Sequence, residues 1–486
     1  MTELEACPTG RATARDKSFG RARCLVWPIA MTATGAAVTV LLLLLLLATE
    51  LLPSAPMQRN LQRSIAQGSL QPEDWPWDRT RGVNQYNDCL LVMMARFRQS
   101  PLSSTVAPLV VFNDYPVPLL DGQGNRRTEC SIAIEAVQSA SPRELLPRES
   151  YFPYSRYVHG YRVPFHVLIS AMPLAEIRLF YRAVVVALLI LILAGQLYRS
   201  YRAFASSDRS QAVAALAFAG ITTSFLLFSG IDLFAQSLAH GPSDIILIAA
   251  LGWLSFRPHR PGIRFDVIVA ALAGLAFGFD FLHGTVPMML AMILGSTALQ
   301  AFAARAQIML LDLVRSIGAF ILGVSGALAA KLLAVLALVG WEGIASFFGQ
   351  LSYRLGGDDY ALADVVEALR RSAVFIGWGI SFLPKAAVIL GFLAAAAAAL
   401  LALFGRMAAW RKMAVLTALL SIAAIVAWYA LFRNHTAVHA GFMVRLLAWP
   451  IAVGPACLLL AALPLREPRA SDAAVRTSES RADQAG

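Results

Sequence analysis

Two histidines and two arginines gather in one short stretch of an otherwise apolar chain. The stretch is Arg433, Asn434, His435, Thr436, Ala437, Val438 and His439, and Arg445 follows soon after. In a helix, His435 and His439 share a face. Imidazole and guanidinium groups together suit a phosphate or pyrophosphate group. The two histidines also suit a divalent cation, although no third ligand is close in sequence. A structural role at the end of a membrane helix is the alternative.

Carboxylates beside tryptophans form a second group of candidates. Asp74 and Asp78 enclose Trp75 and Trp77. Tryptophan faces bind sugar rings by apolar stacking, and a carboxylate can deprotonate a hydroxyl group. This pattern predicts sugar binding and base catalysis. A solvated acidic turn with interfacial tryptophans is the alternative.

Two further carboxylates stand beside apolar runs. Asp88 precedes the run CLLVMM, which predicts a helix beginning near Asn87 or Asp88. Its carboxylate therefore either caps that helix or takes part in chemistry. Asp280 lies in FGFDFLHG, and a carboxylate at membrane depth is costly and usually functional. His283 is close enough along a helix to face Asp280, so a purely structural pair is the alternative.

A segment rich in tyrosine and arginine precedes the second long apolar run. Residues 151–162 read YFPYSRYVHGYR. Such residues favour the headgroup layer of a membrane. We include His159 and Arg162 among the candidate substrate-binding residues, and a plain interfacial belt is the alternative.

The elements that must position these residues are membrane helices. The chain is 58% hydrophobic and only 15% charged, and its excess of apolar residues lies in long runs. Because a spanning helix needs about 20 mostly apolar residues, the runs predict an all-α integral membrane protein with about ten spans. The predicted spans are 27–52, 176–197, 212–236, 243–256, 267–283, 286–304, 316–339, 385–405, 413–432 and 445–464.

The formal charge of +11 follows the same pattern. Basic residues cluster in alternate short loops between the spans, which predicts both termini in the cytoplasm, and so, for a bacterial chain, a place in the inner (cytoplasmic) membrane. Nucleic-acid binding is not expected, because no basic soluble domain is present to carry it.

This topology divides the chain into segments. They are a basic cytoplasmic tail (1–26), a signal-anchor helix (27–52), an extracytoplasmic loop domain (53–175), a polytopic domain (176–465) with an outside amphipathic segment (340–384), and a disordered tail (466–486). Cys89 and Cys130 both lie in the loop domain. In an oxidising compartment they would form either a disulfide or two unpaired thiols.

Four short segments resemble a group of uncharacterised bacterial polytopic membrane proteins. They are 84–88 (NQYND), 155–161 (SRYVHGY), 279–282 (FDFL) and 434–439 (NHTAVH). The resemblance spans most of the chain and implies no particular activity. Val158 stands where that group tends to have tryptophan.

The overall layout more loosely resembles the GT-C superfamily of glycosyltransferases. That resemblance implies many spans, a long first outside loop with an acidic catalytic residue, and a second amphipathic outside loop. It also implies a polyprenyl-phosphate-linked sugar donor and a glycan or lipid acceptor. The first loop lacks the Asp-x-Asp or Glu-x-Asp motif of that superfamily, so Asp74, Asp78 and Asp88 all remain candidates for the base, with Asp280.

A transporter or flippase is the competing interpretation. It needs ionisable groups spread through the membrane and usually an internal repeat. The candidates for such groups are Asp232, Asp280, Lys331 and Lys385, but no repeat is evident. A divalent cation is the only cofactor that the sequence leaves open.

Overall fold

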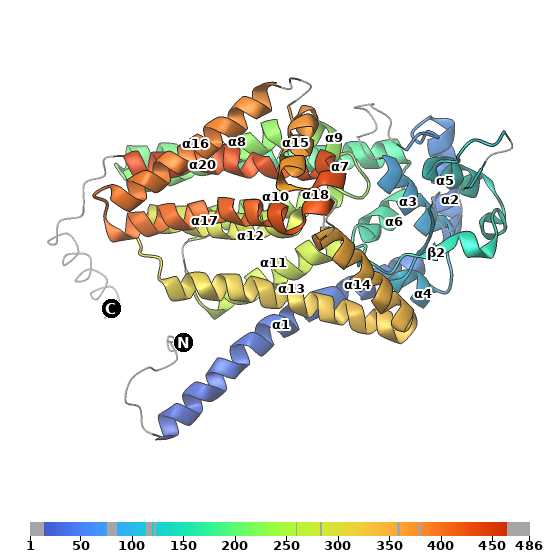
Figure 1. Ribbon diagram of the computed structural model, residues 1–486, viewed down its shortest axis with the longest axis horizontal. Coiled ribbons are helices and arrows are strands. Elements are labelled where there is room, and N and C mark those ends of the chain that lie inside the picture. The colour runs from blue at the N-terminus through green and yellow to red at the C-terminus, as the bar shows by residue number, and fades with distance from the viewer. Residues whose placement is uncertain are drawn as a thin grey trace.

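Long apolar runs make the chain an all-α integral membrane protein (Figure 1). A computed structural model describes residues 14–74, 85–112, 119–120, 123–258, 260–281, 284–356, 360–377, 380 and 382–463. A helix forms at each predicted span, because a helix satisfies its own backbone polar groups in lipid. The helices are α1 (Ala14–Glu50), α7 (Leu174–Ala205), α8 (Arg209–Phe228), α10 (Gly241–Phe256), α11 (Ile263–Asp280), α12 (Thr285–Ala304), α13 (Leu310–Leu338), α16 (Phe382–Phe404), α17 (Ala409–Leu431) and α20 (Ala448–Ala462).

Among the described residues, eight helices are long and apolar enough to cross a bilayer. The last of the eight is the segment Ala440–Ala462, which consists of α20 and the short helical turns directly before it. The two predicted spans outside the count are α10, which is shorter, and α11, which carries Asp266 and Asp280 near its two ends. Because α1 begins at Ala14, the described part of the predicted basic tail is helical and continuous with the first span.

Glycines allow the closest helix pairs to touch. α16 packs along α20, and α1 packs along α13. A Cβ atom on Gly454 of α20 would lie 1.9 Å from the carbonyl oxygen of Gly391 of α16. A Cβ atom on Gly35 of α1 would lie at the same distance from the carbonyl oxygen of Gly323 of α13. Small residues at helix contacts are typical of membrane proteins, because they let two backbones approach closely.

The predicted loop domain folds as a small helical unit at one end of the bundle (Figure 1). Its elements are α2 (Ser54–Ala66), α3 (Gln85–Arg96), α4 (Pro101–Val106), β1 (Leu109–Val111), α5 (Glu129–Gln138), η1 (Pro142–Glu144), η2 (Arg148–Ser150), β2 (Tyr151–Pro153) and α6 (Arg162–Ile169). The two strands pair antiparallel, with Val110 opposite Phe152. Cys89 of α3 and Cys130 of α5 form a disulfide with Cα atoms 5.0 Å apart, which decides between the two alternatives above.

The second predicted outside segment contains two amphipathic helices. They are α14 (Trp341–Gly356) and α15 (Leu362–Ser372), followed by η3 (Ala373–Phe375). α15 buries Val365 and Leu369, while Glu367 on its exposed side pairs with Arg370 and Arg371. The amphipathic character predicted for this segment is therefore confirmed.

Four short helical segments also precede or join spans. They are α9 (Ile231–Phe234), α18 (Arg433–Val438), α19 (Ala440–Met443) and η4 (Val444–Leu447). The first turn of α1 and the last turn of α20 lie at the end of the bundle opposite the loop domain (Figure 1).

The close contact between α16 and α20 predicts a specific sensitivity to substitution. Gly454→Ala should destabilise the protein by about 1–3 kcal/mol, because its methyl group would push the two backbones apart. Gly220→Ala is the matched control, since a Cβ atom there meets nothing within 4 Å. Where nothing is in contact, replacing glycine by alanine in a helix stabilises the helix by about 1 kcal/mol. Apparent melting temperatures in detergent that fall equally for both variants would contradict this account of the packing.

Candidate functional site

A cavity lies where the loop domain meets the end of the bundle. Its empty volume, mouth included, is about 510 Å³. We call it the junction cavity. Its lining comes from four separate parts of the chain: Asn87 and Leu90; Tyr154, Tyr157 and Tyr161; Ala239 and His240; and Phe277, Gly278, Phe279, Asp280 and Phe281. Three of the four segments that carry the first resemblance above, 84–88, 155–161 and 279–282, therefore contribute residues to one cavity.

Backbone contact holds the tyrosine-rich segment against the end of α11. The backbone N–H of Gly160 donates to the carbonyl oxygen of Gly278 at 2.9 Å. A Cβ atom on Gly160 would lie 2.9 Å from that oxygen and 3.1 Å from the ring of Phe279. Glycine is needed at position 160 because any side chain would separate the two segments.

His240 and Asp280 form the ionisable pair of the cavity. Nδ1 of His240 lies 3.9 Å from Oδ2 of Asp280, and the Thr285 hydroxyl donates to that same carboxylate oxygen at 3.1 Å. Nε2 of His240 lies 3.4 Å from the amide nitrogen of Asn87. If the amide donates to Nε2, the imidazole proton is on Nδ1 and faces Asp280. The carboxylate is 8% exposed, so the pair is screened from bulk solvent but borders the cavity.

The three tyrosines of the cavity form a connected group. The rings of Tyr154 and Tyr157 meet edge to face with centroids 5.6 Å apart. Burial raises the pKa of each of Tyr154, Tyr157 and Tyr161. Their hydroxyl groups therefore stay protonated at neutral pH, and the Tyr157 hydroxyl can donate a hydrogen bond to a ligand.

His159 holds this tyrosine group in place and does not face the cavity. Its Nε2 lies 2.9 Å from the carbonyl oxygen of Tyr154, which only accepts, so Nε2 carries the proton. Nδ1 then accepts from the Tyr161 hydroxyl at 2.8 Å. Burial, with the charges of Lys331 and Arg162, holds the pKa of His159 well below its usual value, which matches this neutral form. Its φ of 58° marks a backbone held by its surroundings.

Two arginines lie near the same tyrosine group. After burial, the largest influences on the pKa of Tyr157 are the charges of Arg354 and Arg156, which lower it, and that of Asp280, which raises it. Arg354 belongs to α14 and Arg156 to the loop domain. Nε of Arg156 donates weakly to the hydroxyl of Ser346, also on α14, at 3.4 Å. Neither arginine was a candidate from the sequence.

The histidine pair borders this region through an aromatic contact. The rings of His435 and His439 lie side by side, 4.6 Å between centroids, as their spacing predicts. The Phe442 ring is 6.4 Å from His439 and 4.9 Å from His240. The Asn434 amide donates to the carbonyl oxygen of Tyr353 at 3.0 Å and so joins α18 to α14. Arg433 is half-buried at the start of α18.

Asp88 has a different place from the one predicted. It lies inside α3, fully buried, and is not the capping residue of that helix. Oδ2 accepts from Arg178 at 2.9 Å, while Oδ1 accepts from the Leu238 N–H at 2.8 Å and the Ser237 hydroxyl at 3.1 Å. Both oxygens are thus engaged in holding the loop domain on α7 and on the segment before α10. This arrangement does not fit a catalytic base.

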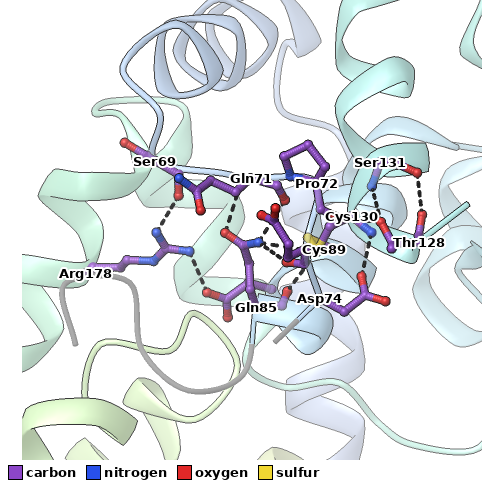
Figure 2. Close-up of a disulfide and its surroundings, with 12 residues drawn as sticks. Ser69, Gln71, Pro72, Asp74, Gln85, Cys89, Thr128, Cys130, Ser131 and Arg178 are labelled. Atoms are coloured by element: carbon purple, nitrogen blue, oxygen red, sulfur yellow. Dashed lines mark hydrogen bonds and ion pairs between the residues drawn. A yellow bond between two sulfur atoms is a disulfide. The ribbon is translucent and has the colours of Figure 1, made fainter. Parts of the chain in front are cut away.

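The surroundings of the disulfide show the place of one other candidate, Asp74 (Figure 2). Asp74 accepts a hydrogen bond from the backbone N–H of Cys130 at 2.9 Å, in the first turn of α5. Gln85 is fully buried and bonds to the backbone of Gln71 and Glu73. Figure 2 shows Arg178 reaching toward Ser69, whose carbonyl oxygen accepts from it at 2.6 Å. Asp74 therefore caps α5, away from the lining of the junction cavity.

Two predicted substrate-binding arginines are already paired. Arg162 is fully buried and forms an ion pair with Glu50 at the end of α1. Arg445 forms a buried ion pair with Asp244 and lies 5.3 Å from the centre of the Phe234 ring. The Arg445 pair lines a second cavity, of about 390 Å³, whose other walls are mostly apolar.

Four of the predicted site residues cannot be placed. Asp78, Trp75, Trp77 and His283 lie outside the described residues. Within the described part of the chain, no group of three or more His, Cys, Asp or Glu side chains could hold a metal ion.

Sequence reasoning missed His240, although it is the partner of Asp280. The residue is a single histidine in the sequence LAHGP between two spans, with no second ligand or base at a telling distance. The sequence gives one indication for His240: the hydropathy pattern places it at the same face of the membrane as Asp280.

The structure predicts opposite outcomes for two carboxylate substitutions. Asp88→Asn should cost about 3–5 kcal/mol, because it leaves Arg178 buried without its counter-ion. Asp280→Asn should accumulate as the wild type does. Asp88→Asn combined with Arg178→Met should recover part of the loss. Equal yield and melting temperature for Asp88→Asn and Asp280→Asn would contradict a structural role for Asp88.

Two buried histidines predict loss of stability in mild acid. Burial, with nearby arginine charges, also holds the pKa of His166 well below its usual value. The unfolded chain binds protons on His159 and His166 below about pH 6.5, whereas the folded chain does not. Stability is therefore complete above that pH and falls as the pH drops below it. His159→Gln and His166→Gln should each reduce the fall in melting temperature between about pH 7.5 and 5.5.

The control for this measurement is the range above pH 7.5, where wild type and variants should respond in parallel. A fall toward pH 5.5 that is as steep in both variants as in the wild type would show that neither histidine is responsible.

Comparison of the chain with protein-family models, with curated proteins and with solved structures found no match. Its function must therefore be argued from the junction cavity itself.

Proposed function

We propose that the chain is a membrane glycosyltransferase that acts at the extracytoplasmic face. It would transfer a sugar from a polyprenyl-phosphate-linked donor to a glycan or lipid of the cell envelope. The observation that carries this proposal is the pairing of Asp280 with His240 in a tyrosine-lined cavity where a folded domain meets the end of a membrane bundle.

The disulfide supports the orientation in this proposal. Cys89 and Cys130 are bridged within the loop domain. Stable disulfides are typical of oxidising compartments such as the bacterial periplasm. The loop domain and the junction cavity would then face the periplasm, with both ends of the bundle's chain at the cytoplasmic side of the inner membrane.

The chemistry needs one base and several hydrogen-bond donors. Asp280 would take the proton from an acceptor hydroxyl as that oxygen bonds to the anomeric carbon of the sugar. The bond from this carbon to the phosphate oxygen breaks, and the phosphate leaves with the electron pair. His240, between Asn87 and Asp280, would orient the carboxylate. The Tyr157 hydroxyl would donate a hydrogen bond to the sugar-phosphate donor, and the hydroxyl oxygens of Tyr154 and Tyr161 would accept hydrogen bonds from the sugar.

The position of the cavity suits a lipid-linked donor. α14 joins the region through the bond from Asn434 to Tyr353. On that helix Trp341 is 73% exposed and Phe348 50% exposed. Exposed aromatic residues on an amphipathic helix favour the membrane interface. A polyprenyl chain could then remain in the bilayer while its phosphate and sugar reach the cavity.

The placement of ionisable groups favours this function over transport. A transporter binds its substrate near the middle of the membrane. On the described helices of the bundle, the pairs Asp244 with Arg445 and Asp266 with Arg315 lie near helix ends. The sequence candidates for transport lie at the loop-domain end: Asp232 in α9, Lys385 in the first turn of α16, and Lys331, which donates to Val106 of α4.

The test is release of polyprenyl phosphate by the purified full-length chain in nanodiscs. The donors are undecaprenyl-phosphate-linked hexoses and pentoses, and the acceptor is a glycolipid extract. We expect release by the wild type and loss of at least about 100-fold in Asp280→Asn, because general base catalysis contributes about 10²–10⁴-fold.

Asp208→Asn is the matched control. Asp208 caps α8 at the far end of the bundle, and asparagine caps a helix as well as aspartate does. Movement of the donor across a proteoliposome membrane without release would favour a flippase instead. Equal release by the wild type and Asp280→Asn would remove Asp280 from the mechanism.

A further inference from the structure

A guanidinium group beside the junction cavity lacks hydrogen-bond partners. Nε and Nη1 of Arg354 are buried and have no partner among the described residues. The group stacks near its neighbour, 5.5 Å from the centre of the Tyr353 ring. Burying such donors without an acceptor is costly, so an acceptor that reaches them would be bound favourably.

A second arginine lies against the same helix. Arg156 stands over the ring of Phe152 at 5.0 Å, and its Nε donates weakly to the hydroxyl of Ser346 on α14 at 3.4 Å. Arg354 and Arg156 come from segments far apart in sequence, yet both act on the hydroxyl of Tyr157. Arg156 is the chain neighbour of Tyr157, which lines the cavity, and its bond to Ser346 places it against α14, the helix that carries Arg354.

The balance of charge in this region is positive. Asp280 is the only acidic residue in the described lining of the cavity. It already accepts from Thr285 and faces His240. The guanidinium groups of Arg156 and Arg354, which have few acceptors within the protein, can therefore bind an anion.

We infer that Arg156 and Arg354, together with the Tyr157 hydroxyl, form a binding site for a phosphate group. Guanidinium groups bind phosphate through paired N–H donors, and the tyrosine adds a donor from another direction. A tetrahedral oxyanion can accept from three directions, whereas a planar carboxylate suits a single guanidinium. This inference deepens the proposed function, on which the identification of the phosphate with the donor rests. It replaces the predicted phosphate ligand Arg445, which is paired with Asp244.

The test is equilibrium binding to the purified full-length chain in phosphatidylcholine nanodiscs. The probes are radiolabelled farnesyl phosphate, a short polyprenyl phosphate, and inorganic phosphate. We expect Arg354→Gln and Arg156→Gln each to weaken binding of farnesyl phosphate by about tenfold or more, as for loss of a hydrogen bond to a charged group. Arg371→Gln should change nothing, because Arg371 is exposed on α15 and pairs with Glu367.

Competition identifies the source of the phosphate. Inorganic phosphate that displaces the probe only at far higher concentration would support a lipid-linked phosphate. Equal affinity for the two probes would support a site for free phosphate. Absence of binding by the wild type, or unchanged affinity in both variants, would overturn the site.

Two provisions keep the outcome interpretable. If Arg354→Gln does not fold, Arg354→Lys and Arg156→Gln carry the test, and lysine should weaken binding less because it keeps the charge but loses the paired donors. Binding that depends on Arg354 without any release of polyprenyl phosphate would keep this site and reject the transferase. Sugar transfer that survives both arginine variants would keep the transferase and reject this phosphate site.

Discussion

The junction between the loop domain and the membrane bundle depends on the buried carboxylate of Asp88. It binds Arg178 at the start of α7 and the backbone N–H of Leu238 before α10. An ion pair buried in this way contributes little net stability, but removal of either partner is severe, so its main effect is to exclude other arrangements. The next residue toward the N-terminus is Asn87, which therefore lies against His240. The disulfide of Cys89 adds a covalent tie to α5 on the other side.

His240 is held from two directions by this arrangement. Leu238, two residues before it, is fixed by Asp88, and Asp244, one helical turn after it, is fixed by Arg445. A side chain placed between two anchored points has little freedom to move. A catalytic pair must be held in this way by its surroundings, because a small displacement of a reacting group lowers the reaction rate strongly. The same pairings explain why Asp88 and Arg445 are unsuited to bind substrate themselves.

Much of the fold could be predicted from the sequence, but the partners within the site could not. Apolar runs and charge between them predicted a helix at every span, since membrane insertion depends on local composition. The segments around Asn87, Tyr157 and Asp280, which the sequence singled out, all line the junction cavity. The pairing of Asp88 with Arg178 could not be predicted, because the two residues are distant in sequence and nothing local distinguishes a buried structural carboxylate from a base. His240 and Arg354 carried no motif, so only the fold could bring them to the cavity.

The central claim is that the loop domain and the end of the bundle form one site. Cross-linking tests it directly: Asn87→Cys and His240→Cys are introduced together and treated with a short bifunctional thiol reagent in intact membranes. The account predicts an intramolecular cross-link, because these two side chains approach within 3.4 Å. The pair Asn87→Cys and Asp208→Cys, at opposite ends of the bundle, should give none. Efficient separate labelling of positions 87 and 240 without any cross-link would contradict the account.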